Sequence, residues 1–310
     1  ADAVYFGYGE LNARRNAKNF DEQSLAEASR LCKERGVKMH MTVNTMVYDR
    51  EYDEVLRTLE IACKYGIDAL IVQDLGVAKI VREAAPEMKM HASTQLTVHN
   101  VSGAWQAKEL GFSRVVLARE MSREEILQVT TQVPVETEVF VHGALCMCVS
   151  GQCYMSSVIG ERSGNRGLCA QPCRLPFASG RKGDSGYALS LKDLSLADRV
   201  KELMALGVDS FKIEGRMKTA LYVATVARTY RKAIDDYLRS EEEYRNNLPW
   251  YRDEIAKCTY RQFTTGFYFG KPSEQAQIYD NNTYVSEYIY LGIVGAVRED
   301  GLARIEQRNK

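Results

Sequence analysis

The sequence lacks the features that mark membrane and secreted proteins. No run approaches the roughly 18 apolar residues of a membrane span, and no segment resembles a signal peptide. Acidic and basic side chains are equally numerous, 41 of each, so an overall basic field is absent too. Any contact with nucleic acid must therefore come from a local patch.

Histidine is scarce. The chain has only His40, His91, His99 and His142, and it contains no His-Glu-x-x-His metal motif and no recognisable Ser/His/Asp arrangement. Hydrolytic machinery of a familiar type is therefore hard to assemble. One alternative stays open, since His142 is close in sequence to Cys146 and Ser156-Ser157 offer hydroxyls, which would suit a peptidase.

Cysteine is abundant and clustered. Five of the eight cysteines fall in one Gly-rich stretch, at positions 146, 148, 153, 169 and 173. Thiolates at such spacings bridge to one another or bind a soft metal. Cys32 and Cys63 stand apart on helical patterns and are interpreted as buried small apolar residues in a reducing cytosol. We therefore expect a cytoplasmic protein without structural disulfides.

Two kinds of metal site remain open for the cluster. Structural zinc prefers paired Cys-x2-4-Cys knuckles; Cys169-x3-Cys173 could supply one, but Cys146-x6-Cys153 is too wide for the other. An iron–sulfur cluster needs four thiolates and tolerates irregular spacing on a flexible, Gly-rich segment. The residues favour the iron–sulfur interpretation and keep zinc as its alternative.

A repeated pattern of helix, Gly and apolar strand predicts the fold. The clearest copies are residues 64–74, 109–120 and 205–216. Alternating strands and helices imply an α/β protein with a parallel sheet, and their number favours a TIM-like (β/α) barrel, one that lacks its first unit. The predicted strands lie near residues 3–7, 37–43, 68–72, 88–92, 114–118, 135–141, 187–191 and 210–214.

The same pattern divides the chain. We expect the barrel over 1–240, with a long Cys-rich insert at 143–186 lying across its mouth. A helical arm and linker would follow over 241–283, and a small β domain would begin over 284–310. The chain opens without Met and ends just after a predicted hairpin, so we expect both ends, and that β domain, to be truncated.

Polar residues follow most of the predicted strands. In (β/α) barrels the chemistry lies at the carboxyl ends of the strands. Side chains that should converge on this rim are Asn44, Gln73, Asp74, Ser93 to Gln95, Arg119, Glu120, His142, Lys192, Asp193, Glu214 and Arg216.

Several longer motifs resemble those of one family. They are EVFVHGALCMCVSGQCYMS at 138–156, NRGLCAQPCRLP at 165–176, SLKDL at 190–194 and DSFKIEGRMK at 209–218, with ADAVYFG at 1–7 and NAR at 12–14. In this order they closely resemble the signature of peptidase family U32, the collagenase-like proteins. The resemblance covers essentially the whole chain.

The resemblance implies a function. The family was named for reported protease activity without a defined catalytic type. Similar members include hydroxylases of a tRNA wobble uridine or a ribosomal RNA cytidine, with prephenate implicated, and several hold a [4Fe–4S] cluster on cysteines of this region. It implies that Cys146, Cys153 and Cys169 are ligands. Several relatives have Cys where this chain has Ser195, so the fourth ligand must come from another position. Cys173 is the first candidate for it, and Cys258 and Cys148 are held in reserve. The alternative is a site with three cysteine ligands and one open iron.

On this basis we expect an iron–sulfur-dependent RNA hydroxylase with tRNA or rRNA as partner. The runner-up is a peptidase of collagen-like or unfolded chains, and a third class is a scaffold stapled by zinc. The sequence is compatible with a homo- or hetero-oligomer. Basic stretches at 174–182 and 228–232 could meet phosphates. The candidate site residues are Asp74, Glu120 and Glu214 for proton transfer, and Arg119, Lys192, Arg216 and, least favoured, Lys212 for a carboxylate co-substrate such as prephenate.

Overall fold

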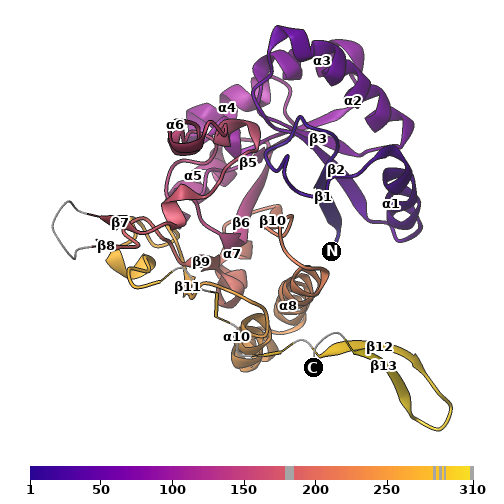
Figure 1. Ribbon diagram of the computed structural model, residues 1–310, viewed down its shortest axis with the longest axis vertical. Helices are drawn as coiled ribbons and strands as arrows, with labels where there is room; N and C mark the ends of the chain where they lie inside the picture. Colours follow the sequence, from indigo (N-terminus) through magenta and orange to yellow (C-terminus); the bar gives the residue numbers. More distant parts are fainter. Residues whose placement is uncertain (179–184, 282–283, 286–287, 290, 308–310) are drawn as a thin grey trace.

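A nine-stranded, mostly parallel sheet forms the centre of the molecule (Figure 1). The computed structural model describes residues 1–178, 185–281, 284–285, 288–289 and 291–307. Six parallel strands follow one another in sequence order: β1 (Ala3–Gly7), β2 (Lys38–Val43), β3 (Ala69–Val72), β4 (Lys89–Ala92), β5 (Arg114–Val116) and β6 (Glu136–Ala144). The predicted α/β class is therefore confirmed.

Three more strands extend the sheet from β6. Strand β10 (Ser210–Ile213) pairs with β6 in parallel, while β9 (Asp193–Ser195) pairs with its far end antiparallel. Strand β11 (Phe263–Thr264) then pairs with β9. The strand predicted at 187–191 is wrong in position, because a turn occupies 188–189 and the strand begins only at Asp193.

Helices connect the parallel strands. Side-chain caps start most of them; Asp74, for example, accepts from the backbone N–H groups of Gly76 (2.8 Å) and Val77 (3.0 Å). The helices are α1 (Glu22–Glu34), α2 (Tyr52–Lys64), α3 (Leu75–Ala84), α4 (Val101–Glu109), α5 (Arg123–Gln132), α7 (Val200–Ala205) and α8 (Ala220–Arg239).

The core lies between the sheet and these helices. Every residue of β3 is buried, and α1, α3 and α8 bury Leu25, Val77 and Val226 against the sheet. Burying a side chain of this size contributes about 1.5–3 kcal/mol. Cys63 corrects an expectation: it is exposed on α2, next to the fully buried Ala62, and Cys32 is only half-buried.

The Cys-rich segment lies between β6 and β9. It contains α6 (Met155–Gly160) and the short pair β7 (Phe177–Ala178) and β8 (Ser185–Gly186). After α8 come α9 (Glu241–Asn246), α10 (Leu248–Ala256) and an antiparallel hairpin of β12 (Gly292–Val297) and β13 (Ala303–Gln307), which projects from the body (Figure 1). The division at 240 and 283 stays a prediction. Within the described residues, no helix is long and apolar enough to cross a bilayer.

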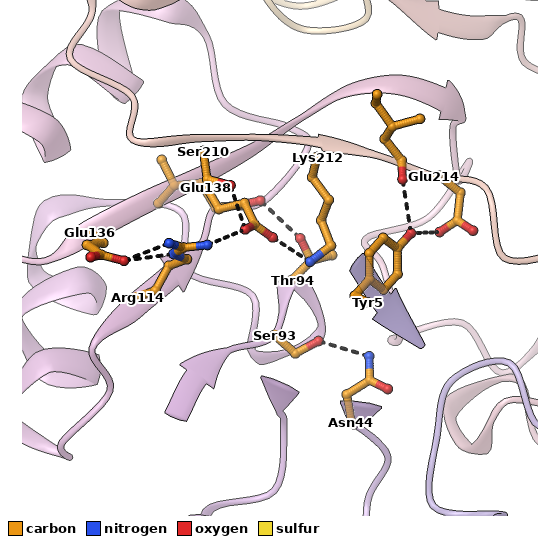
Figure 2. Close-up of polar contacts among 12 residues, drawn as sticks. Tyr5, Asn44, Ser93, Thr94, Arg114, Glu136, Glu138, Ser210, Lys212 and Glu214 are labelled. Carbon is orange, nitrogen blue, oxygen red and sulfur yellow. Dashed lines mark hydrogen bonds and ion pairs between the residues drawn. The ribbon is translucent and has the colours of Figure 1, made fainter. Parts of the chain in front are cut away.

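The first and last parallel strands meet through side chains. The Tyr5 hydroxyl on β1 lies 3.3 Å from the carbonyl oxygen of Ile213 on β10 and 3.3 Å from the carboxylate of Glu214 (Figure 2). Among the described strands, β1 and β10 share no backbone ladder. The sheet therefore curves far enough for its ends to touch.

Charged and aromatic polar groups occupy the sheet interior. Glu138 accepts from Arg114 (3.0 Å), from Ser210 (2.9 Å) and from Lys212 (Figure 2). Burial alone would raise the pKa of Glu138, but the charges of Lys212 and Arg114 outweigh it and lower the pKa to about 2. The rings of His40 and His91 pack edge to face with centroids 4.7 Å apart. The charged groups are therefore paired with one another, and the two imidazole rings are buried.

Buried histidines should make stability depend on pH. Burial lowers the pKa of His40 to about 4 and those of His91 and His142 to about 3. Unfolded histidine titrates near pH ~6.5, so between about pH 6.5 and 4 the unfolded chain binds more protons than the folded one. The free energy of unfolding should therefore fall as pH falls, by up to about 1.4 kcal/mol per pH unit for each histidine.

Urea unfolding at pH 7.5, 6.5 and 5.5 measures this effect above about pH 4.5, near which the Glu138 carboxyl of the unfolded chain takes up its proton. His91→Gln should flatten the slope. A wild-type stability that is constant across these pH values would contradict the assignment.

Candidate functional site

A cavity of about 550 Å³ opens at the carboxyl ends of the parallel strands. This volume suits a small molecule or a single nucleotide. Its wall includes Asn44 after β2, Gln95 after β4, Arg119 after β5, Cys146 after β6 and Glu214 after β10. The structure thus brings together residues from five strand ends, the arrangement that the repeated pattern predicted.

All four predicted cysteine ligands line this cavity: Cys146, Cys153, Cys169 and Cys173. Every cysteine of the chain is a free thiol. The backbone N–H of Gln171 donates to Cys169 Sγ at 3.3 Å, the type of contact that stabilises a thiolate.

Burial acts against ionisation of two of these thiols, Cys146 and Cys173. Desolvation raises the pKa of Cys146, although the residue is open to the cavity and Arg119 opposes the rise. Burial likewise raises the pKa of Cys173, with Arg174 acting against it. A bound metal would have to supply the charge that keeps these sulfurs deprotonated.

The four cysteines have the composition that an iron–sulfur cluster takes. Within the part of the chain that the structure describes, no three His, Cys, Asp or Glu side chains are close enough to hold one metal ion. A cluster of four irons spreads its ligands over a larger body than one zinc ion does, and it takes four Cys. Four free thiols facing one cavity from Gly-rich loops have that chemistry.

The reserve positions are not part of the cavity wall, although Cys148 forms a hydrogen bond with Cys153, which lines it. Cys148 and Cys258 are absent from the cavity wall, and Cys258 is buried. Ser195 lies on β9, where its hydroxyl is a hydrogen-bond partner of the buried Tyr230 hydroxyl. Tyr230 is fixed in turn by donating to the carbonyl oxygen of Val141 at 2.7 Å. Of the alternatives for a fourth ligand, only Cys173 reaches the cavity.

Three arginines surround one buried carboxylate in the cavity. Arg14 Nη2 lies 3.7 Å from Glu214, Arg119 donates to the Ala144 carbonyl oxygen (3.2 Å), and Arg216 donates to Asn12 Oδ1 (2.6 Å). Burial alone would raise the pKa of Glu214, but the charges of Arg14, Arg119 and Arg216 outweigh it and lower the pKa. Glu214 is therefore ionised, and the three arginines leave this wall net positive. We call Arg14, Arg119 and Arg216 the arginine wall.

Arg14 was missed as a site residue. Its side chain is 37% exposed, and it lines the cavity. A signal for it existed, because the Asn12-Ala-Arg14 motif is part of the resemblance. Tyr5 was missed too, since the sequence placed it only within a strand predicted near residues 3–7. Burial first, and then Glu214, raise the pKa of Tyr5 well above the usual value, so it remains a hydroxyl donor.

Three predicted site residues lie outside the cavity wall. Asp74 caps α3 and also accepts from the Val47 N–H at 3.2 Å. Glu120 has one carboxylate oxygen buried without a partner, and Lys192 is half-buried, its backbone N–H bonded to Ala276. Their assignment to proton transfer and substrate binding stays a prediction. Lys212 lines the cavity floor, where it pairs with Glu138.

His142 does not accompany Cys146. It is 2% exposed and packs among Tyr222, Tyr230 and Phe263, with ring centroids 5.6–5.9 Å away. It is absent from the cavity wall that Cys146 lines. The His–Cys pair that a cysteine peptidase would need is therefore not assembled.

The basic stretch at 228–232 is engaged within the protein. Arg228, Arg231 and Lys232 pair with Glu254, Asp235 and Asp236, all on α8 or α10. In the other stretch, Arg174 is buried, and residues 179–184 lie outside the described residues. Neither forms an open phosphate-binding patch in the described part.

Gly167 should be essential for packing the Cys-rich segment against the loop that carries Arg14. A Cβ there would lie 2.3 Å from the Asn12 carbonyl oxygen and 2.9 Å from the Arg15 nitrogen, at a φ of +82°. Gly167→Ala should cost about 1–3 kcal/mol of stability and make the exposed Cys169 react faster with thiol reagents, because the loop must move away from the residues that carry Arg14. Thermal unfolding and the rate of thiol labelling at Cys169 measure both effects.

Gly160→Ala is the matched control, since a Cβ at Gly160 meets nothing within 4 Å. Equal behaviour of the two variants would show that the contact at Gly167 is not required.

Comparison with known proteins places these motifs in context. The model of Peptidase family U32 matches residues 1–278. A tRNA hydroxylation protein of Bacillus subtilis is 35% identical over the whole of this chain and 76% of its own length. A collagenase of Porphyromonas gingivalis is 36% identical over 87% of this chain and 69% of its own. A 23S rRNA 5-hydroxycytidine synthase of Escherichia coli is 38% identical over 76% of this chain but only 36% of its own length.

Proposed function

The chain belongs to peptidase family U32, and from that premise we propose that it is an iron–sulfur enzyme that hydroxylates a pyrimidine base of tRNA or ribosomal RNA. The observation that carries this proposal is the shared cavity, into which four free cysteines and the arginine wall both open. Relatives similar over most of this chain are named as RNA hydroxylation proteins, which supports the reaction class.

Cys146, Cys153, Cys169 and Cys173 would hold a [4Fe–4S] cluster. When bound, such a cluster supplies one-electron redox chemistry to a substrate in the cavity. Ser195 is not a ligand in this proposal, because its hydroxyl partners Tyr230 instead of facing the cavity. Zinc on the same thiols is the alternative.

The arginine wall would bind a carboxylate co-substrate such as prephenate. Arginine recognises carboxylates through two parallel hydrogen bonds, and burial strengthens such pairs. Arg119 is fixed for this task, since its guanidinium lies 3.9 Å from the Phe140 ring centroid. Glu214 would orient Arg14 and hold the Tyr5 hydroxyl at the edge of the cavity.

The proposal extends to the architecture. The curved sheet would be a TIM-like barrel whose ends meet at Tyr5 and Glu214, with the Cys-rich segment over its mouth. Such an enzyme would work in the cytoplasm, where its RNA substrates and a reducing environment are found. A peptidase remains the second candidate because a collagenase is among the relatives, although His142 lies away from Cys146.

Anaerobic purification should yield a brown protein with about four irons and four sulfides per chain. Cys146→Ala, Cys153→Ala, Cys169→Ala and Cys173→Ala should each reduce iron content and visible absorbance. Ser195→Ala is the matched control that should retain both, because its side chain does not line the cavity and bonds to Tyr230 instead. A colourless protein with one tightly bound zinc would contradict the cluster proposal.

Deleting the gene should remove one hydroxylated pyrimidine from cellular RNA. Mass spectrometry of nucleosides from separated tRNA and rRNA measures this loss and identifies the RNA. Restoring wild-type protein should recover the nucleoside, whereas Arg119→Ala should recover at most about a tenth of it, given the cost of losing a charged hydrogen bond. If every hydroxylated pyrimidine persists in the deletion strain, the RNA proposal fails. Gelatin cleavage by the pure protein that is lost in Cys146→Ala would instead favour the peptidase.

A further inference from the structure

One polar side chain in the cavity has no assigned task. Gln95 follows β4 in the short turn Thr94–Leu96. The turn is fixed locally, because Gln95 N–H donates to Ser93 Oγ (3.2 Å) and the Thr94 hydroxyl donates to the Leu117 carbonyl oxygen (3.0 Å). Gln95 is 8% exposed and lines the cavity. The backbone that carries its amide is therefore held at a defined place on the wall.

The Gln95 amide carries an unsatisfied acceptor. Its Oε1 is buried and has no hydrogen-bond partner among the described residues. Leaving a buried acceptor unpaired costs about 1–3 kcal/mol, so such a group in a cavity wall is suited to a donor that arrives with a ligand.

The Cys-rich segment packs directly on this amide. A Cβ at Gly151, between Cys146 and Cys153, would lie 2.8 Å from Gln95 Nε2 and 2.9 Å from its Cγ. Only glycine permits this approach. Gln95 therefore lies where the strand ends meet the loop between two proposed cluster ligands, next to the place where a reacting base must sit.

We propose that Gln95 reads the Watson–Crick edge of the substrate base. This inference rests on the proposed function, which makes that base a pyrimidine. A glutamine amide offers an acceptor beside a donor. Uracil presents the complementary N3–H beside a carbonyl oxygen, and cytosine presents its amino group beside N3. Bases outside a duplex are commonly recognised by hydrogen bonds to this edge.

Binding of mononucleotides tests the contact without relying on catalysis. Calorimetry with the cluster-loaded protein would compare uridine 5′-monophosphate with its N3-methyl derivative, which lacks the donor. Wild type should bind the unmethylated nucleotide about tenfold more tightly, the value of one hydrogen bond to a buried acceptor. Gln95→Leu should lose this preference, and it should also weaken binding of cytidine 5′-monophosphate.

Gln73→Leu is the matched control. Gln73 follows β3, is 5% exposed and also has an unpartnered Oε1, but it does not line the cavity. It should keep the tenfold preference. Gln95→Glu preserves the shape of the side chain but replaces the amide donor with an oxygen and adds a negative charge, so it should weaken uridine binding even where Gln95→Leu alters folding.

Two results would overturn the assignment of Gln95. One is a preference for the unmethylated nucleotide that is unchanged in Gln95→Leu, and the other is a wild-type protein that binds neither pyrimidine nucleotide. The proposed function is decided separately by the nucleoside spectra of the deletion strain. A hydroxylated nucleoside that disappears there, together with an unchanged preference in Gln95→Leu, would reject Gln95 alone.

Discussion

The contact between Gly167 and the loop that carries Arg14 is the constraint on which the site depends. There the Cys-rich segment touches the backbone of Asn12 and Arg15 with no room for a side chain. Arg166 reinforces the contact by donating to the Met46 carbonyl oxygen (2.7 Å) and pairing with Glu51. Without this contact between Gly167 and the Arg14 loop, the cysteines would not share a cavity with the arginine wall. Glycine in this segment thus serves close packing, where the sequence had indicated flexibility.

Two groups of buried charge have opposite roles around the cavity. Deep in the sheet, Lys212 pairs with Glu138 and Arg114 pairs with both Glu138 and Glu136. Two cations therefore face two carboxylates, and that group has little remaining field to offer a ligand. Nearer the strand ends, Glu214 faces Arg14, Arg119 and Arg216 and leaves positive charge uncompensated. An anion entering the cavity would therefore be attracted to the arginine wall and not to the floor (Figure 2 shows Glu138 and Glu214 on their separate sides).

Much of the fold could be predicted because its signals are local. The pattern of helix, glycine and buried strand located β1 to β6 and β10 within a few residues. It failed at 187–191, where Ser190 to Lys192 have a strand-like composition but precede the actual strand. The reason is tertiary: β9 forms only where β6 offers it an antiparallel partner at Gly143 and Ala144. Such pairing leaves no mark on a single segment.

The sequence by itself determined the α/β class, the family and the clustering of five cysteines, because each depends on residue type and spacing along the chain. Only the tertiary structure decided which of these side chains meet. In the folded chain Ser195 forms a hydrogen bond with Tyr230, and Asp74 caps a helix. Arg14 lies beside Glu214, although the two are 200 residues apart in sequence. The physical reason is that a strand end fixes where a backbone stops, while the direction of its side chains depends on neighbours contributed by distant strands and loops.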